Sequence, residues 1–359
     1  MLLEHPSGRP GSAEDDLRIC TKSSRPPPQK PDSVLVYVGL DRTGDGLIKL
    51  PFVYALRRSF PEARITWLAG KGESVFAREM NAFVRGALDE VVENAGVGSR
   101  FSELLGPRPL AGRGFDLVID TQRRLLTTLI VRRIRHGAFV SGTANFLLSD
   151  VQPQGPDRPR SVAMQLAELL ELAGGLPPQG ACGAAADPDS ESLAARLLPA
   201  GPAYVGFAPG AGKAEKCWPL ARYVEVARAE AEAGRVPVFL LGPMDVALAG
   251  EIRAALPRAL LPLQEAAAIT PALTIALGRR LVAAVANDCG AGHLLAASGV
   301  PLVSLFGPTS AEKFAPAAAR LAVLRAQDWG GRAMEAIPAV AVVKALEDAI
   351  GRSPAGSPA

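Results

Sequence analysis

Residues 281–295 read LVAAVANDCGAGHLL, and this stretch decides the fold of the chain. The apolar run at its start is typical of a buried strand. A second apolar run, residues 294–298, follows the two glycines and indicates a helix. A strand, a glycine turn and a helix start are where α/β proteins bind anions, because free N–H groups and the positive end of the helix dipole face the ligand.

Four residues of this turn are candidates for ligand binding: Asp288, Gly290, Gly292 and His293. The plainer interpretation is that the glycines only reverse the chain and that His293 begins a helix. We favour a binding site, because an acid and a histidine flank the glycines at a strand-to-helix junction. A further apolar run, residues 300–306, leads to a loop containing Thr309, and two such neighbouring loops predict one ligand crevice.

The composition bounds the class of protein. A length of 359 residues, of which 48% are hydrophobic, suits two domains with a core each. A net charge of +3 and an aromatic content of 5% argue against nucleic acid as a partner. The four cysteines are scattered without zinc-ligand spacing, so we expect no metal site and a reducing, cytoplasmic location. We also expect no signal peptide and no membrane span.

The first half opens with a similar unit. Residues 34–38, VLVYV, are typical of a parallel strand covered on both faces. A glycine loop follows, and then a helix predicted over residues 47–60, with Pro51 near its first turn. The glycines lack the spacing of a dinucleotide fingerprint. Asp45 in the loop is either a helix N-cap or a catalytic base, and the residues alone favour the cap.

The rest of the first half alternates between strands and helices, which predicts a mainly parallel sheet. Strands are expected at residues 64–69, 90–92, 115–120 and 136–140, and helices at residues 73–83, 123–135 and 161–174. The helix over residues 123–135 carries five arginines. We interpret them as a solvated face, with contact to an anionic acceptor or a membrane surface as the alternative.

In the second half, a strand expected at residues 203–208 ends in the glycine loop 209–213. This loop is not a P-loop, because Phe207 replaces the first glycine and Ala214 follows the lysine. Lys213 and Lys216 are either solvated or phosphate ligands. We favour a functional Lys216, because the following Trp218-Pro219 pair restricts its backbone.

The chain therefore divides into four segments: a disordered leader (1–33), a first α/β domain (34–180), a second α/β domain (190–350) and a tail (351–359). Ligands bind beyond the carboxyl ends of parallel strands. Two such domains facing each other predict a cleft that brings a donor on one half to an acceptor on the other.

Three segments together resemble glycosyltransferase family 9, the ADP-heptose:lipopolysaccharide heptosyltransferases. They are residues 34–61 with Thr43-Gly44-Asp45, residues 209–219 with Gly210 and Lys216-Cys217-Trp218-Pro219, and residues 287–309. They follow the family's order and span most of the chain. The resemblance implies a GT-B fold, with two Rossmann-like domains of mainly parallel sheets facing across a cleft. It places the acceptor in the first domain and the donor in the second.

The resemblance also implies an inverting, metal-independent transfer, with an ADP-linked heptose as the default donor and no further cofactor. The acceptor would be a glycolipid or oligosaccharide of the lipopolysaccharide core or another surface glycan, met at the inner face of the cytoplasmic membrane. Asp45 becomes the catalytic base, and Lys216 neutralises the leaving pyrophosphate. Donor-binding positions are Gly210, Lys213, Lys216, Asp288, Cys289, Gly290, Gly292, His293 and Thr309; acceptor-binding positions are Arg42, Thr43, Gly44 and Arg123.

The chain departs from the family at Gly212 and Cys289, where Ser or Thr is usual. These changes leave the donor's identity open, and with it the alternative of a catalytically degenerate, nucleotide-sugar-binding scaffold protein. A sugar-nucleotide epimerase is a further class with α/β layers. We find neither its NAD fingerprint nor its Tyr-x-x-x-Lys pair in this sequence.

Overall fold

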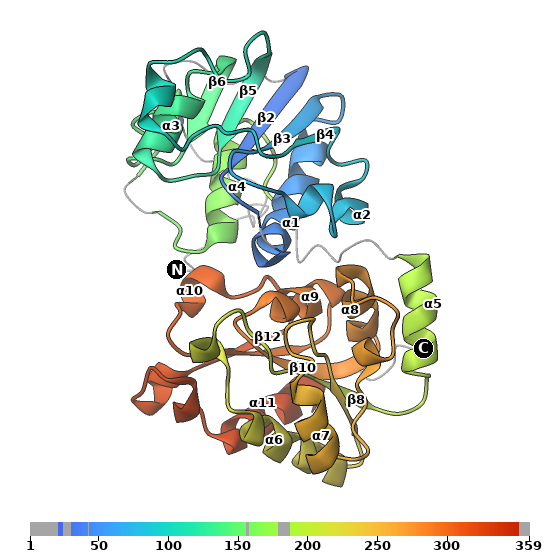
Figure 1. The fold of residues 1–359 in the computed structure, drawn as a ribbon. Helices are drawn as coiled ribbons and strands as arrows, with labels where there is room; N and C mark the ends of the chain where they lie inside the picture. The colour runs from blue at the N-terminus through green and yellow to red at the C-terminus, as the bar shows by residue number, and fades with distance from the viewer. Residues whose placement is uncertain (1–20, 24–29, 42, 156–157, 179–186, 352–359) are drawn as a thin grey trace, which may run out of the picture.

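The computed structural model describes residues 21–23, 30–41, 43–155, 158–178 and 187–351. These residues form two α/β halves, drawn one above the other in Figure 1, each with a sheet of five parallel strands. The expected fold class, α/β with mainly parallel sheets, is confirmed. The predicted leader and tail lie mostly outside the described residues, as does the segment 179–186 between the halves.

In the first half, the strands lie side by side in the order β4-β3-β2-β5-β6. The chain builds the sheet outward from β2 to β4 and then crosses to the other side of β2 to add β5 and β6, so the strand order reverses between β2 and β5. Outside this sheet, two short strands pair antiparallel, β1 (Thr21–Ser23) and β7 (Val151–Pro153). The elements of the half are β2 (Ser33–Val38), α1 (Thr43–Ser59), β3 (Arg64–Ala69), α2 (Asn81–Val84), β4 (Glu90–Val92), β5 (Gly114–Asp120), α3 (Leu125–Val131), β6 (Arg135–Ser141) and α4 (Val162–Leu172), with 3-10 turns at η1 (Val75–Ala77) and η2 (Phe101–Leu104).

The second half has the order β12-β11-β10-β8-β9, with its reversal between β8 and β10. Its elements are α5 (Pro188–Leu197), β8 (Tyr204–Ala208), η3 (Ala214–Lys216), α6 (Leu220–Glu232), β9 (Val236–Phe239), α7 (Leu248–Ala255), η4 (Pro262–Gln264), α8 (Pro271–Gly278), β10 (Leu281–Asn287), α9 (Gly290–Ser298), β11 (Leu302–Phe306), α10 (Ala311–Phe314), β12 (Leu321–Arg325), η5 (Ala326–Trp329), η6 (Met334–Ala336) and α11 (Ala339–Gly351). In doubly wound sheets, ligands bind where the strand order reverses.

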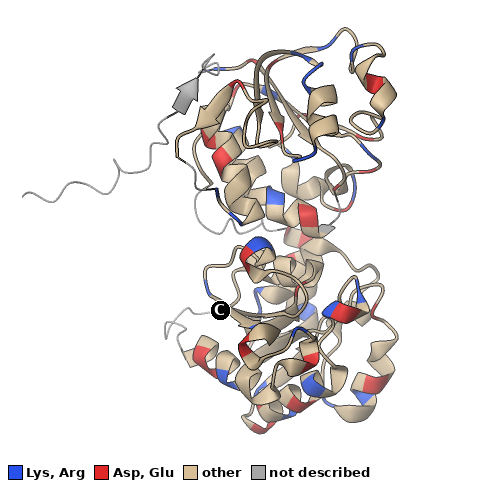
Figure 2. Ribbon diagram, turned by 90° about the vertical axis from the view of Figure 1, so that its left-hand side faces the viewer, with Lys and Arg blue, Asp and Glu red and all other residues tan. Residues whose placement is uncertain are grey.

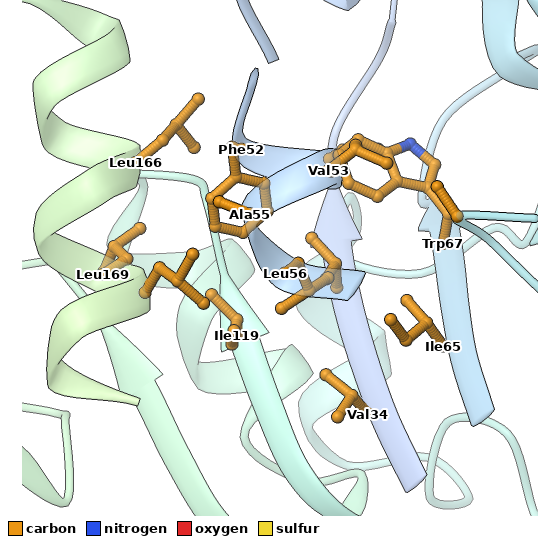
Figure 3. Close-up of a cluster of buried hydrophobic side chains, with 14 of the residues drawn as sticks. Val34, Phe52, Val53, Ala55, Leu56, Ile65, Trp67, Ile119, Leu166 and Leu169 are labelled. Carbon is orange, nitrogen blue, oxygen red and sulfur yellow. The ribbon is translucent and has the colours of Figure 1, made fainter. Parts of the chain in front are cut away.

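The continuous apolar run of β2 is explained by burial on both faces of its sheet. Val34 and Val36 point into the core beneath α1 and α4, whereas Leu35 and Tyr37 point into the core beneath α3. Figure 3 shows the first of these cores, where Trp67 of β3 packs close to Phe52 of α1, with ring centroids 6.5 Å apart. Successive side chains of a strand point to opposite faces of its sheet, and both faces of this sheet are covered. Every side chain of the run is therefore buried and apolar.

The two halves share a packed boundary. Leu294 of α9 and Ile275 of α8 are buried in the same cluster as the first half's core beneath α1. In Figure 1, α1 and α4 form the lower edge of the first half and face α8 and α9 of the second. The two reversal points are therefore held together by apolar burial.

Helix α1 begins earlier than its sequence pattern suggests. The predicted start at residue 47 is wrong, because residues 43–46 already belong to the helix. Asp45 consequently lies in the first helical turn instead of capping it, and Pro51 lies in the helix interior. An interior proline leaves the carbonyl four residues before it, on Leu47, without its helical donor.

The predicted basic helix over residues 123–135 is also wrong. Helix α3 contains no arginine, because Arg124 precedes it in extended backbone and Arg132 ends it. Arg135 opens strand β6, one residue before the predicted strand. The predicted helix over residues 73–83 is divided into η1 and α2. Strand β12, which was not predicted from the sequence, is a half-buried edge strand whose apolar run is limited to residues 321–324.

Burial of Asp120 at the end of β5 gives the first half a pH-dependent stability. Its carboxylate accepts hydrogen bonds from Thr128 Oγ1 (2.6 Å), Ser141 Oγ (3.0 Å) and the Gln122 amide (2.9 Å). Removal from water outweighs these bonds and raises the pKa of Asp120 to about 6. A carboxyl whose pKa is raised on folding contributes most stability below its unfolded pKa and loses that contribution as pH rises through 6.

We therefore predict that the unfolding free energy of the wild type, measured relative to Asp120→Asn in urea, falls by about 2 kcal/mol between pH 4 and pH 7. The variant serves as the reference because its amide carries no charge at either pH. A difference between the two proteins that stays constant across this range would contradict the prediction.

Candidate active site

The centre of the candidate site is an ion pair between two loops of the second half. Lys216, at the end of η3, donates from Nζ to Oδ2 of Asp288 at 2.7 Å. Thr309, after β11, donates from Oγ1 to the same oxygen at 2.7 Å. Asp288 is buried, whereas a quarter of the Lys216 side chain is exposed. The carboxylate therefore fixes the ammonium group at the edge of the crevice and leaves part of it open to a ligand.

Asn287, the last residue of β10, holds the loops around this pair. It is fully buried, and its Oδ1 accepts from the Trp218 amide (3.1 Å) and the Tyr223 hydroxyl (3.0 Å). Its Nδ2 donates to the carbonyl of Pro209 at 2.7 Å. Sequence reasoning did not single out this residue. The available signal was an amide at the end of an otherwise apolar strand.

The N-terminus of α9 lies open above the same crevice. A Cβ placed on Gly290 would meet no atom within 4 Å, so a ligand can approach the backbone there. Gly292 has a packing role, because a Cβ on it would come within 3.0 Å of the Asn287 carbonyl. The first turn of α9 carries the positive end of the helix dipole.

Cys289, at the N-cap of α9, is half-buried and remains a thiol at neutral pH. Burial is the largest influence and raises its pKa to about 11, although the amides of Ala291 and Gly292 act in the opposite direction. The nearby carboxylates of Asp288 and Asp245 reinforce the upward shift. The residue can therefore supply a weak S–H donor but no anionic nucleophile.

The first half meets this crevice at the start of α1. A Cβ on Gly44 would lie 4.0 Å from the Cα of Gly290, so the first turns of α1 and α9 face each other. Asp45, in that turn of α1, is exposed. Its carboxylate also influences His293. The pKa of His293 is lowered overall, because burial outweighs the opposing effect of the Asp288 and Asp45 carboxylates. One crevice thus contains an exposed carboxylate, a neutral imidazole and two positive helix ends.

The structure brings only some of the predicted positions to this crevice. Lys213 is exposed and its ammonium lies 3.7 Å from the Glu215 carboxylate, whereas the ammonium of Lys216 pairs with Asp288. Gly210 approaches Asp245 so closely that no Cβ would fit. Arg123 is exposed and lines a separate hollow on the first half with Gln122, Gly142, Phe146 and Gln165.

Two further predicted positions have no described side chain. Arg42 lies outside the described residues, and Thr43 opens α1 without a described side chain. Within the described ranges, no group of three or more His, Cys, Asp or Glu side chains could hold a metal ion.

A second buried ion pair anchors the loop between β2 and α1, just before Asp45. The Asp41 carboxylate pairs with Lys49 of α1 and also accepts from the Trp67 indole N–H (2.6 Å) and the Ser74 hydroxyl (3.3 Å). Asp41 and Lys49 are both buried. The sequence analysis did not identify this pair, which holds the loop from β2 against the first turns of α1.

We predict that Asp41→Asn and Lys49→Met each destabilise the protein by roughly 3–5 kcal/mol, because each leaves a buried charge without its partner. The double variant is expected to lose at least about 1 kcal/mol less than the sum of the single losses. Urea unfolding of the four proteins completes the cycle. Strict additivity of the two losses would show that the pair is not coupled.

Both the sequence and the fold are similar to those of known proteins. The family model for glycosyltransferase family 9 (heptosyltransferase) matches residues 107–336. Lipooligosaccharide heptosyltransferase 2 of Haemophilus influenzae is 32% identical over 125 residues. That match covers 34% of this chain and 36% of the relative, so it spans about a third of the relative's length.

Solved structures show the same fold over most of the chain. A family 9 glycosyltransferase of Veillonella parvula has a TM-score of 0.68 at 20% identity, covering 90% of this chain and 98% of its own. E. coli ADP-heptose LPS heptosyltransferase II has a TM-score of 0.61 at 20% identity, covering 89% and 99%. These likenesses confirm the GT-B type of fold that the sequence resemblance implied. Since the family model matches well over half of its length, the chain belongs to glycosyltransferase family 9, the heptosyltransferase family.

Proposed function

We propose that the protein is an inverting, metal-independent glycosyltransferase that moves a heptose from ADP-heptose to an acceptor of the lipopolysaccharide core or another surface glycan. The observation that carries the proposal is the meeting of the exposed Asp45 carboxylate with the anion-binding side of the second half, at the Gly44–Gly290 contact. The first half holds the acceptor and the second half holds the donor.

The choice of ADP-heptose draws on the relatives. E. coli heptosyltransferase WaaC has been solved with ADP and with ADP-2-deoxy-2-fluoro heptose. The structure with ADP has a TM-score of 0.64 at 19% identity to this chain. The Haemophilus relative acts, by its name, on lipooligosaccharide. In this chain, the open backbone at Gly290 and the partly exposed Lys216 suit the diphosphate of such a donor.

In the proposed reaction, the Asp45 carboxylate accepts the proton of an acceptor hydroxyl while that oxygen attacks the anomeric carbon of the sugar. The bond from the anomeric carbon to the diphosphate oxygen breaks, and ADP leaves with the bonding electrons. Attack from the face opposite the leaving group inverts the configuration. Burial favours the neutral His293 at neutral pH, so this imidazole can donate or accept a hydrogen bond without adding charge.

The charge that develops on the leaving diphosphate is stabilised by groups already in place. Lys216 contributes its ammonium, and α9 contributes the amides of its first turn. The Asp288 carboxylate does not repel the diphosphate strongly, because it accepts hydrogen bonds from both Lys216 and Thr309. Fixed donors of this kind can perform the role that a bound cation performs in other transferases.

On the acceptor side, the proposal assigns the loop of Arg42, Thr43 and Gly44 and the hollow at Arg123. A Cβ on Gly39 would meet the Gln122 side chain at 2.8 Å, so the loop between β2 and α1 adjoins this hollow at the reversal between β2 and β5. A glycolipid acceptor would bring the enzyme into peripheral contact with the inner face of the cytoplasmic membrane.

Calorimetric titration with ADP, UDP and GDP, each with and without EDTA, tests the donor site. We predict selective ADP binding that EDTA does not change. Lys216→Met is expected to weaken ADP binding roughly tenfold to a hundredfold, because a charge-assisted contact is lost. The matched control is Lys344→Met, which replaces an exposed lysine on α11 of the same half and leaves the affinity nearly unchanged.

Failure to bind any of the three nucleotides would overturn the proposal and favour a scaffold protein. Selective binding of UDP or GDP would retain a transferase and discard ADP-heptose.

A transfer assay with ADP-heptose tests the catalytic base. Asp45→Asn is expected to lower kcat by roughly 100- to 10,000-fold, because the amide cannot accept the acceptor proton. ADP affinity of the same variant should match the wild type, since Asp45 lies on the opposite half from the donor. Wild-type turnover in Asp45→Asn would remove Asp45 from the mechanism.

A further inference from the structure

Two large apolar side chains protrude from one short turn of the first half. Phe101 of η2 is 69% exposed, and Leu105, directly after η2, is 87% exposed. Single exposed apolar residues are ordinary, but two on one turn form a patch that calls for an explanation. At the start of the neighbouring α3, Leu125 is 56% exposed.

The turn is held rigidly in this exposed position. The Arg133 guanidinium donates to the carbonyls of Glu103 and Gly106, and Thr127 of α3 donates to the Gly98 carbonyl at 2.8 Å. The Glu103 carboxylate accepts from three backbone amides, those of Gly98, Ser99 and Arg100. The exposure of Phe101 and Leu105 is therefore built into the fold, and the carboxylate beside them is engaged with the backbone.

Arginines surround the apolar turn. A hollow beside it is lined by Arg108, Arg132, Arg133, Arg135 and His136. Arg132 pairs with Asp150 at 2.7 Å. In the part of the chain that the structure describes, no ion pair joins Arg108, Arg133 or Arg135 to a carboxylate. The hollow therefore keeps a net positive charge.

The surface extends from this hollow toward the cleft. Helix α3 carries no charged side chain, and Arg124 flanks its other end. That end follows the carboxyl end of β5, the edge of the sheet where the Asp45 loop also lies. Figure 2 views the side of the molecule on which α3 lies in Figure 1, with lysine and arginine in blue.

We propose that this surface, the η2–α3 face, docks on a bilayer of anionic phospholipid. The face is defined by Phe101, Leu105, Leu125, Arg100, Arg108, Arg124, Arg133 and Arg135. Its apolar side chains enter the interfacial region of the bilayer, and its arginines meet the phosphate groups. A rigid apolar turn ringed by arginines complements such a bilayer in both charge and polarity. Within the described residues, no helix has the length and apolar character of a membrane span.

The proposal deepens the proposed function, because a lipid-linked acceptor lies in such a bilayer. Two arginines near this face also hold the fold together. Arg132 holds Asp150 and the Leu148 carbonyl, and Arg133 holds the turn, so replacing either would disturb the fold as well as the surface. Arg108 and Arg135, both exposed, are the informative positions.

The test is flotation of the full chain with vesicles of 30% phosphatidylglycerol in phosphatidylcholine, compared with pure phosphatidylcholine. We expect the wild type to bind the anionic vesicles selectively and less tightly at higher salt. Phe101→Ser/Leu105→Ser should abolish binding. Arg108→Gln/Arg135→Gln should weaken it by about fivefold for each charge removed. Circular dichroism confirms that each variant is folded.

Matched controls lie on the second half. Met244→Ser/Val246→Ser removes two exposed apolar side chains, and Arg253→Gln/Arg258→Gln removes two exposed charges. Both should bind vesicles like the wild type. Wild-type binding by the η2–α3 variants, equal losses in the controls, or equal binding to neutral vesicles would each overturn the proposal.

ADP titration of the same proteins separates this proposal from the proposed function. Variants of the η2–α3 face should keep wild-type ADP affinity, because none of the replaced residues lies at the donor crevice. A wild type that binds vesicles but no nucleotide would overturn the transferase and leave the docking surface standing. A wild type that binds ADP but no anionic vesicle would overturn the docking surface and leave the transferase standing.

Discussion

The side chain of Asn287 is the constraint on which the candidate site depends. It joins the end of β10 to the loop after β8 and to the start of α6, and its hydrogen bonds are all buried. A buried amide with both ends satisfied favours one arrangement of its neighbours over others. Lys216, only two residues before Trp218, is consequently held where Asp288 can pair with it.

The second requirement is that the halves approach each other closely. Small residues permit this: Gly44 and Gly290 face each other at the two helix starts, and Ala296 and Ala297 of α9 line the same boundary as Leu50 of α1. Each half alone presents one positive helix end. Together they bring the first turn of α9 beside the first turn of α1, which carries the exposed Asp45 carboxylate.

Most strands could be predicted from the sequence, because burial on both faces produces apolar runs such as residues 34–38. The half-buried edge strand β12 has only a short apolar run, residues 321–324. The start of α1 and the break-up of the arginine-rich helix depended on loop anchors and caps that local patterns do not reveal. Asn287 and the Asp41–Lys49 pair depend on contacts between residues distant along the chain or in separate elements. Asp288, by contrast, stood out because an acid beside glycines is visible in the sequence.

Amide hydrogen exchange with and without ADP tests most directly whether the α9 crevice is the nucleotide site. The account predicts slower exchange upon ADP binding in residues 287–293 and 209–219. Exchange in residues 99–108, on the η2–α3 face, should not change. Unaltered exchange in residues 287–293 under saturating ADP, or protection confined to other segments, would contradict the account.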